Sequence, residues 1–316
     1  MVLDRQQTAK ALPWKELIDC LDRVFTQDVN SPVRHHHSMK VPGDPDATML
    51  LMPAWIEGEY SGVKIVNVFP GNNKHGLAGL TGHYLLSCGK TGQLLLQLDG
   101  NELTSRRTAA ASALASRYLS RENTNTMLMV GAGRMARYLI PAHMSVRPIE
   151  TVYVWGRSLE SSQRLVEELK GDGINALVCL PENLQEIAQQ VDLISCATMA
   201  TEPLIKGEWL SEGTHLDLVG SFTPKMRETD NTAMQIGEVF VDTRAGALSE
   251  TGDLITPINE GVITAESIVA EFSDLCADQH RGRADLENSD HAITVFKSVG
   301  ASIEDLAAAI LAHRNP

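Results

Sequence analysis

The chain has 316 residues, of which 43% are hydrophobic and 21% are charged, and its formal net charge at pH 7 is −13. This composition is typical of a globular protein of about two domains and excludes a disordered or collagen-like chain. The acidic charge disfavours nucleic acid and anionic membrane surfaces as partners, and no apolar run reaches the roughly 18 residues of a spanning helix. The 5 cysteines form no CxxC pair, so we expect no metal site and a reduced, cytoplasmic compartment.

The first part of the chain predicts one helix and then an antiparallel meander. Residues 14–29 carry apolar side chains at helical spacing. His35, His36 and His37 follow, and we interpret them as a loop with some metal affinity, because no further ligand lies nearby at metal-binding spacing. Strand-like runs at 48–52, 62–68, 83–87 and 93–99 are separated by glycine-rich turns, the last of which is Asp99-Gly100-Asn101. An alanine-rich helix is predicted from Ser105 to about Leu119.

After residue 122 apolar strands alternate with helices. Strands are predicted at 127–130, 151–155, 176–179, 193–197, 215–219 and 238–241, and helices at 161–169 and 184–190, with a final amphipathic helix at 303–313. Such alternation is typical of a parallel, doubly wound sheet. The predicted fold class is α/β, with a Rossmann-type doubly wound parallel sheet and a mixed α/β domain, divided near residues 105–122.

One glycine-rich motif stands between a predicted strand and a predicted helix. Gly131-Ala132-Gly133-Arg134-Met135-Ala136 fits the pattern G-x-G-x-x-A. Gly131 permits the tight turn, Gly133 lets the backbone approach a pyrophosphate, and Ala136 allows close packing of helix on strand. The following helix N-terminus offers N–H groups and a positive dipole end to phosphates. We therefore favour a dinucleotide site over a purely structural glycine turn.

The end of the second predicted strand of this domain indicates which dinucleotide binds. NAD sites place Asp or Glu about 20 residues after the glycines, where this sequence has Gly156-Arg157-Ser158. Arg157 can pair with a 2′-phosphate and Ser158 can donate a hydrogen bond to it. We expect NADPH as the cofactor, with NADH used more weakly. The alternative is that Arg157 is a solvated surface residue.

Further short stretches follow one another along the chain in a specific order. They are Met52-Pro53-Ala54, Gly62-Val63-Lys64-Ile65-Val66-Asn67, Arg106-Arg107-Thr108-Ala109-Ala110, Val219-Gly220 with Pro224 and Glu228, and Thr294-Val295-Phe296-Lys297-Ser298-Val299-Gly300. With them, the chain from about Arg34 to Ala309 resembles the ornithine cyclodeaminase/mu-crystallin family. The resemblance implies a homodimer whose substrate-binding and dimerisation domain comprises residues 1–112 and the C-terminal helix 301–316. It assigns residues 113–300 to an NADP(H)-binding Rossmann domain.

The same resemblance implies a substrate pocket with three cations, Arg34, Lys64 and Arg107. Arginine binds a carboxylate through two parallel hydrogen bonds and lysine adds a point charge, which suits a small α-imino acid. Arg107 could instead face solvent from its alanine-rich helix. Lys64 is harder to dismiss, because a charge in an apolar strand needs a partner.

The resemblance also implies cofactor contacts outside the glycine motif. Those from the first domain are Thr81, Arg107 and Thr108. Those from the second domain are Thr198, Met199, Val219, Ser221, Lys297 and Ser298. Helix capping is the alternative role for Thr198 and Ser298.

Two apolar residues decide which branch of the family the chain resembles. Ornithine cyclodeaminases carry acidic groups where this sequence has Leu50 and Phe222, and an apolar pocket cannot solvate a second ammonium group. The chain therefore looks more like the ketimine reductases, which reduce the cyclic imino acids Δ1-pyrroline-2-carboxylate and Δ1-piperideine-2-carboxylate to proline and pipecolate. We expect Phe222 and Met226 to pack against the ring methylenes. An ornithine cyclodeaminase, an amino-acid dehydrogenase, or a crystallin-like protein that binds NADPH without turnover are the alternatives.

In the reductase interpretation, hydride reaches C2 of the imine while the cations hold the carboxylate. No strong acid is needed if the imine arrives protonated. If a proton must be supplied, Lys64, or a water held by it, is the candidate donor.

Overall fold

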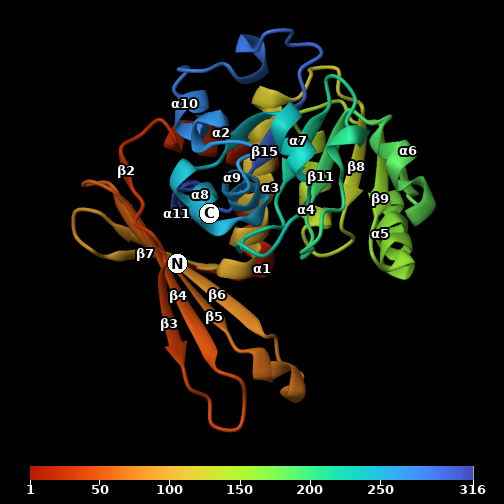
Figure 1. Ribbon diagram of the computed structural model, residues 1–316. Coiled ribbons are helices and arrows are strands. Elements are labelled where there is room, and N and C mark those ends of the chain that lie inside the picture. Colours follow the sequence, from red (N-terminus) through yellow and green to blue (C-terminus); the bar gives the residue numbers. More distant parts are fainter. Residues whose placement is uncertain (316) are drawn as a thin grey trace. The chain divides into compact units, whose positions relative to one another are not determined.

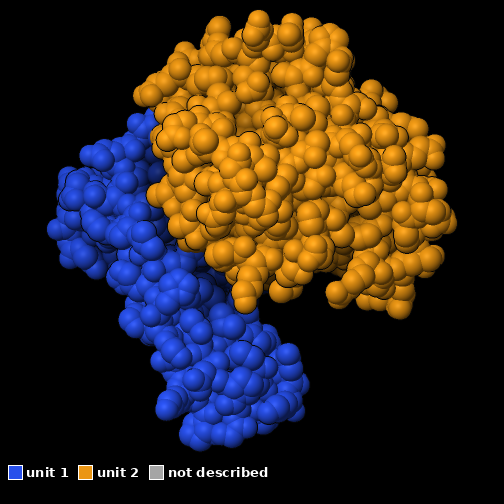
Figure 2. All heavy atoms as spheres, in the orientation of Figure 1, with its two compact units in different colours: residues 1–108, 301–316 blue, residues 109–300 orange. Residues whose placement is uncertain are grey.

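The computed structural model describes residues 1–315, which divide into two compact units. Of the described residues, unit 1 comprises 1–108 with 301–315, and unit 2 comprises Ala109–Gly300 (Figure 2). Within the described residues, no helix combines the length and the apolar character that crossing a membrane requires. The same residues bring no three His, Cys, Asp or Glu side chains together in a group that could hold a metal ion.

A mostly antiparallel sheet forms most of unit 1 (Figure 1). The predicted meander is confirmed in β4 (Ala47–Ile56), β5 (Tyr60–Val68), β6 (Leu80–Cys88) and β7 (Leu94–Asp99), each antiparallel to the next. Two short strands, β1 (Val2–Leu3) and β2 (Val29–Asn30), add to the sheet through β7 and β4, and β1 alone of the described pairings in this sheet runs parallel to its neighbour.

The three consecutive histidines lie in a strand, so the interpretation as a loop is wrong. They belong to β3 (His35–Met39), which pairs antiparallel with β4. All three side chains are exposed, so the strand shows no apolar alternation in its sequence. The backbone pairing with β4, rather than burial of apolar side chains, holds this segment as a strand.

The helices of unit 1 are α1 (Arg5–Ala11), α2 (Trp14–Val24), the 3-10 turn Pro70–His75 and α11 (Ser302–Arg314). The predicted α2 is confirmed, although it ends at Val24 rather than at residue 29. The expectation that the last helix is amphipathic is wrong, because every residue from Ser302 to Ala312 is buried. Its neighbours α2, β4, β5 and β6 contact it on several sides, and a helix covered all round needs no polar face.

Helix α3 (Gly100–Leu119) contributes residues to both units. It begins earlier than predicted, because the Asp99 carboxylate accepts a hydrogen bond of 2.7 Å from the backbone N–H of Glu102 and so caps the first turn. Gly100 and Asn101, expected in a turn, are therefore its first residues.

Unit 2 contains the predicted parallel sheet, in the order β10-β9-β8-β11-β12-β15-β13-β14. The strands are β8 (Thr126–Val130), β9 (Thr151–Trp155), β10 (Ala176–Val178), β11 (Leu193–Cys196), β12 (His215–Leu218), β13 (Glu238–Val241), β14 (Ile268–Glu271) and β15 (Thr294–Lys297). The strand order reverses between β8 and β11. Ligands of doubly wound sheets bind at such a reversal, beyond the carboxyl ends of the strands.

Seven α-helices of unit 2 follow α3 in the described chain. They are α4 (Ala136–Met144), α5 (Leu159–Gly171), α6 (Leu184–Ala188), α7 (Asn231–Ile236), α8 (Arg244–Glu250), α9 (Gly252–Asn259) and α10 (Phe272–Cys276). Leu128, Ile194, Leu216 and Val295 from four adjacent strands are fully buried in the core. This core fixes the strand ends from which the loops of the site extend.

Arginine side chains satisfy the carbonyl groups at the C-terminal end of α3. Arg147 donates to the carbonyl oxygens of Ser116, Arg117 and Ser120 at 2.9, 2.8 and 3.0 Å. Arg283 donates to the carbonyl oxygen of Leu119 at 2.6 Å. Cations at a helix C-terminus also interact favourably with the helix dipole. Together these contacts fix the end of α3 beside the start of the parallel sheet.

We expect Arg147→Met to lower the free energy of unfolding by about 2–4 kcal/mol, because several carbonyl groups lose their donor. Arg281→Met is the matched control, because Arg281 is an exposed arginine of unit 2 whose ion pair with Asp285 lies at the surface. The control should change stability by no more than about 0.5 kcal/mol. Urea denaturation of both variants measures the difference, and equal effects would contradict the capping role.

Candidate active site

Two of the predicted cations form a buried ionic cluster in unit 1. Lys64 on β5 and Arg107 on α3 are 2% and 5% exposed. The Lys64 Nζ lies 2.9 Å from Oδ1 and 2.7 Å from Oδ2 of Asp305. The Arg107 Nε lies 3.0 Å from Asp305 Oδ1, and its Nη1 lies 2.6 Å from Glu304 Oε2. Arg107 therefore does not face solvent, and the partner that a buried Lys64 requires is Asp305.

The two carboxylates come from the first turn of α11, and the sequence reasoning missed both. Glu304 and Asp305 have no exposed surface. Negative groups are favourable at a helix N-terminus, and Glu304 also accepts a 3.3 Å hydrogen bond from the backbone of Ala301. The signal available was indirect: a charged residue inside the apolar strand β5 demands an opposite charge from elsewhere in the chain.

Burial lowers the pKa of Lys64 from its usual 10.5 to about 8. The charge of Asp305 opposes this shift, whereas the positive charges of Arg107 and Arg34 add to it. Arg34, directly before β3 and partly exposed, is therefore close enough to act on Lys64 electrostatically. At neutral pH Lys64 is mostly protonated, yet it releases a proton more readily than a surface lysine.

The glycine motif of unit 2 has the shape that a dinucleotide requires. Gly131 has a φ of +115°, and a Cβ there would lie 2.6 Å from the carbonyl oxygen of Ala197. Gly133 is exposed, and no atom lies within 4 Å of the position of an added Cβ. Helix α4 begins at the buried Ala136. The loop therefore presents bare backbone at the point where the resemblance expects a pyrophosphate.

The loops after β9 and β11 meet this glycine loop. A Cβ on Gly156 would lie 3.0 Å from the Cβ of Ala132, and one on Gly131 would lie 3.3 Å from Cγ2 of Thr198. Arg157 is exposed at the end of β9. The Ser158 hydroxyl accepts a 3.3 Å hydrogen bond from the backbone of Ser161 and caps α5.

A single buried carboxylate joins the loops after β11 and β12. Glu228 accepts hydrogen bonds from the backbone N–H and the hydroxyl of Thr198 at 2.6 and 2.8 Å, and from the backbone N–H of Gly220 at 2.6 Å. Burial raises the pKa of Glu228 to about 7, against the opposing charge of Lys297. Thr198 thus supports the loop rather than capping a helix. The sequence alone gives Glu228 no role beyond its place in the family-like stretches, because its partners Thr198 and Gly220 meet it only in the fold.

The remaining predicted residues of unit 2 differ in exposure. Lys297 is fully buried and donates to the carbonyl oxygen of Leu218 at 2.9 Å. The Ser221 hydroxyl is also buried and donates to the carbonyl oxygen of Met226 at 2.6 Å. Met226 is 6% exposed, whereas Phe222 is 51% exposed.

Other predicted contacts are found at the following places. Met199 is 80% exposed, Ser298 is 3% exposed, and Val219 is partly buried. In the turn before α4, Arg134 is exposed and Met135 is partly buried. In unit 1, Thr81 is exposed on β6 and Thr108 is partly buried on α3. Ser298 caps no helix, since α11 begins at Ser302.

We expect Gly133→Ala to raise the dissociation constant for NADPH at least about tenfold, because an added methyl group would stand where the resemblance expects the pyrophosphate. No protein atom obstructs that methyl group, so the thermal unfolding temperature should not change. Fluorescence titration with NADPH measures the binding. Gly131→Ala is the contrasting variant: its strained φ and its approach to Ala197 should lower stability as well.

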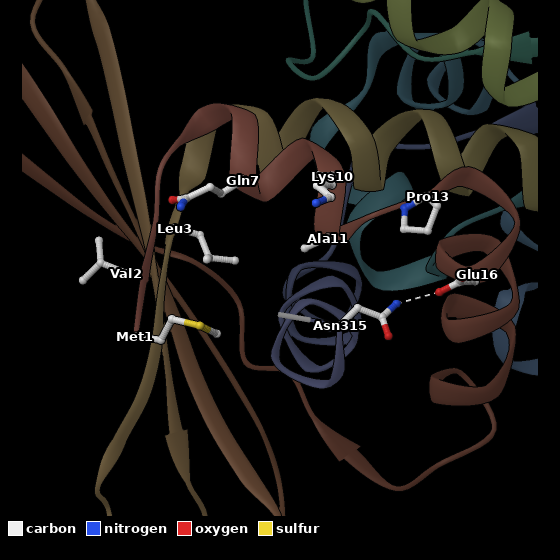
Figure 3. Close-up of a pocket in the computed structure, with 9 residues that line it drawn as sticks. All are labelled: Met1, Val2, Leu3, Gln7, Lys10, Ala11, Pro13, Glu16 and Asn315. Atoms are coloured by element: carbon white, nitrogen blue, oxygen red, sulfur yellow. Dashed lines mark hydrogen bonds between the residues drawn. The ribbon is translucent and has the colours of Figure 1, made fainter.

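A cavity of about 580 Å³ in unit 1 lies apart from these residues. It is lined by Met1, Val2, Leu3, Gln7, Lys10, Ala11, Pro13, Glu16 and Asn315 (Figure 3). Asn315 donates to Glu16 at 2.6 Å across one side of it. None of the predicted site residues lines this cavity.

Comparisons with known proteins agree over almost the whole chain. The model of the ornithine cyclodeaminase/mu-crystallin family matches residues 1–315. An uncharacterised protein of Schizosaccharomyces pombe is 50% identical over 320 residues, 99% of this chain and 96% of that protein. The Δ1-pyrroline-2-carboxylate reductase of Paracoccus denitrificans is 38% identical over 296 residues, 91% of this chain and 92% of that enzyme. The structure of the Thermococcus litoralis Δ1-pyrroline-2-carboxylate reductase with NADH and L-proline is 34% identical, has a TM-score of 0.89, and covers 100% of this chain and 97% of that one.

Proposed function

Because the chain belongs to the ornithine cyclodeaminase/mu-crystallin family, we propose that it is an oxidoreductase that reduces a cyclic ketimine with a reduced nicotinamide cofactor. The substrates are Δ1-pyrroline-2-carboxylate, Δ1-piperideine-2-carboxylate or both, and the products are L-proline and L-pipecolate. Reductases of the first of these imines are among the relatives that match most of the chain.

The observation that carries this proposal is the buried ionic cluster of unit 1. A carboxylate bound by Arg107 and Lys64 lies among groups with little access to water, where charged hydrogen bonds are strong. No acidic residue stands at the positions of Leu50 and Phe222, so these positions offer no counter-charge to the second amino group of ornithine.

We assign the cofactor to the loops of unit 2. The backbone of Gly131, Ala132 and Gly133 holds the pyrophosphate, and Arg157 pairs with the 2′-phosphate of NADPH. When bound, the reduced nicotinamide supplies the hydride that C2 of the imine accepts. Glu228 fixes the loops of Thr198 and Gly220, which line the carboxyl edge of the sheet.

The chain's own residues orient the substrate and hold one proton. Arg107 and Lys64, with Arg34, bind the carboxylate and so restrict the orientation of the adjacent C2. When the imine arrives protonated, its nitrogen keeps that proton as the C=N bond becomes a C–N bond. When the imine arrives neutral, a proton from Lys64 Nζ passes to the nitrogen, and Asp305 stays hydrogen-bonded to the neutral amine.

The proposal extends to the roles of the two units and to assembly. Unit 1 binds the substrate and dimerises with a second copy, and unit 2 binds NADP(H). Sedimentation velocity tests the dimer directly, since a monomer at micromolar concentration contradicts that part of the proposal.

The deciding experiment is oxidation of NADPH in the presence of each ketimine, and the loss of absorbance of the reduced nicotinamide measures the reaction. Turnover with proline or pipecolate as the product supports the reductase. Release of ammonia from ornithine would instead indicate a cyclodeaminase. Tight binding of NADPH and of a carboxylated ligand without turnover would indicate a binding protein.

A further inference from the structure

The two loops that Glu228 joins follow β11 and β12, on one side of the reversal of strand order in unit 2. A doubly wound sheet binds a dinucleotide across this reversal, with one half of the cofactor on each side. In the proposed function, Arg157 at the end of β9 contacts the adenosine half, and the glycine loop after β8 holds the pyrophosphate. The loops of Thr198 and Gly220 therefore lie on the side of the nicotinamide half.

These loops pack closely against each other and against the glycine loop. A Cβ on Gly220 would collide with the backbone of Thr198 and with Oε1 of Glu228, so a side chain does not fit there. A Cβ on Gly131 would lie 2.6 Å from the carbonyl oxygen of Ala197, at the start of the same loop as Thr198. The three loops thus form one continuous surface at the carboxyl edge of the sheet.

Glu228 fixes the direction of the peptide group between Val219 and Gly220. Its Oε2 accepts the backbone N–H of Gly220 at 2.6 Å. The described peptide bonds are trans, so the N–H and the C=O of one peptide group point in opposite directions. The carbonyl group of Val219 therefore points away from the buried carboxylate. Within residues 1–315, no backbone or side-chain donor bonds to that carbonyl oxygen.

The main chain of Glu228 is itself held on both sides. Its N–H donates to Asp253 Oδ1 at 2.8 Å, and its carbonyl oxygen accepts from the N–H groups of Leu204 and Ile205 at 2.9 and 3.1 Å. Asp253 is fully buried, and its Oδ2 lies 3.6 Å from the Nζ of Lys297. The carboxylate of Glu228 is therefore a fixed point to which both loops are attached.

We propose that Glu228 positions the nicotinamide of the cofactor, by holding the peptide group before Gly220 so that the carbonyl oxygen of Val219 accepts a hydrogen bond from the nicotinamide carboxamide. This inference rests on the proposed function and adds the group that orients the reacting ring. A primary carboxamide carries two N–H donors, which suits an open carbonyl acceptor. Glu228 contacts the loops rather than the cofactor, so it is a positioning residue.

The protonation state of Glu228 decides whether it can hold both loops. Burial raises the pKa of Glu228 from 4.5 to about 7; the charge of Lys297 on β15 opposes this shift, and that of Asp253 on α9 adds to it. The hydrogen bonds from Thr198 also lower this pKa, and the nearby thiol of Cys196 on β11 stays neutral, because burial raises its own pKa. A protonated Glu228 donates through its O–H, so one of the groups that donate to it loses its acceptor. The hold on both loops is therefore complete above pH 7 and is lost as pH falls through about 7.

Binding of NADPH and of 2′-phospho-ADP-ribose tests this role without turnover. The second ligand is NADPH without its nicotinamide, so the ratio of the two dissociation constants isolates the contribution of the ring. We expect Glu228→Gln to reduce the preference for NADPH at least about tenfold, because the amide nitrogen of glutamine would face an N–H group that the carboxylate accepts. Affinity for 2′-phospho-ADP-ribose should change less than about threefold. Glu228→Asp, which keeps the charge, should recover part of the preference, and isothermal titration calorimetry measures each constant.

Asp192→Asn is the matched control. Asp192 accepts the backbone N–H groups of Asn125 and Thr126 at 3.0 and 3.1 Å and the hydroxyl of Thr126 at 2.9 Å, the same kinds of contact that Glu228 makes. It directly precedes β11, so it joins the amino ends of the strands instead of the carboxyl ends. This variant should lower the thermal unfolding temperature and leave the preference for NADPH unchanged.

The native protein gives a second readout, which holds even if Glu228→Gln does not fold. Its preference for NADPH over 2′-phospho-ADP-ribose should decrease as pH falls through about 7, as Glu228 takes up a proton. The comparison of NADH with ADP-ribose repeats the test without the 2′-phosphate, so a failure of Arg157 to recognise that phosphate does not affect it.

The outcomes separate this inference from the proposed function. If ketimines are reduced but Glu228→Gln keeps the native preference, or weakens both ligands equally, Glu228 only stabilises the sheet and the inference is wrong. A native preference that does not change between pH 8 and pH 6 contradicts it as well. If no ketimine is reduced and none of the four nucleotides binds, the proposed function itself fails.

Discussion

Arg107→Met should lower kcat/KM for Δ1-pyrroline-2-carboxylate by about 10³-fold, through loss of charged hydrogen bonds to the substrate carboxylate in a buried site. KM should rise and kcat should fall together, because the same contact binds the substrate and orients C2. Arg107→Lys should recover only part of the loss, since an ammonium group cannot contact two carboxylates in the plane that Arg107 provides. Steady-state kinetics with NADPH in excess measure both parameters.

Arg106→Met is the control for this prediction. Arg106 precedes Arg107 on α3, pairs with Glu102 at 3.0 Å, and lies outside the cluster of Lys64 and Asp305. The Arg106→Met variant should retain kcat/KM for Δ1-pyrroline-2-carboxylate within about threefold of the native value. If Arg107→Met behaves like Arg106→Met, the substrate carboxylate binds elsewhere.

Arg157→Ala should raise KM for NADPH by about 10²-fold and change KM for NADH less than about threefold. The reason is the proposed pairing of the guanidinium with the 2′-phosphate, which NADH lacks. The side chain is exposed at the end of β9, so its removal should not alter the stability of the parallel sheet. Kinetics with each cofactor at saturating ketimine measure the ratio.

Arg164→Ala provides the comparison, because Arg164 is an exposed arginine of α5 whose ion pair with Glu160 lies at the surface. The Arg164→Ala variant should leave KM for NADPH and KM for NADH unchanged. Equal effects of Arg157→Ala on NADPH and NADH would remove the case for recognition of the 2′-phosphate.

The parallel sheet was predictable because the pattern within each segment agrees with the alternation of strands and helices along the whole of unit 2. Gly131 and Gly133 stand between an apolar strand and a helix, and the later strands alternate with helices at a regular distance. Lys64 was also informative from the sequence. A charged side chain in an apolar strand needs either an ion-pair partner in the protein or a bound ligand of opposite charge. The structure provides a partner, Asp305.

The features that sequence reasoning missed are those that depend on distant contacts. His35–His37 become a strand through pairing with β4, which no pattern within the strand reveals. Glu304 and Asp305 look like ordinary first-turn acids of a helix, and only the fold places Lys64 and Arg107 against them. The burial of α11 on all sides has the same origin, because its neighbours come from the other end of the chain.

The position of α11 in the sequence affects how the protein is made. The ribosome synthesises β5 and the first part of α3, including Arg107, before any of unit 2, but it synthesises α11 only after unit 2. Until then Lys64 and Arg107 lack the carboxylates that make their burial favourable, so unit 1, which is begun first, is completed last. A nascent chain stalled before residue 302 therefore carries the strands of the N-terminal sheet without α11, and such an incompletely packed unit is a target for chaperones and proteases.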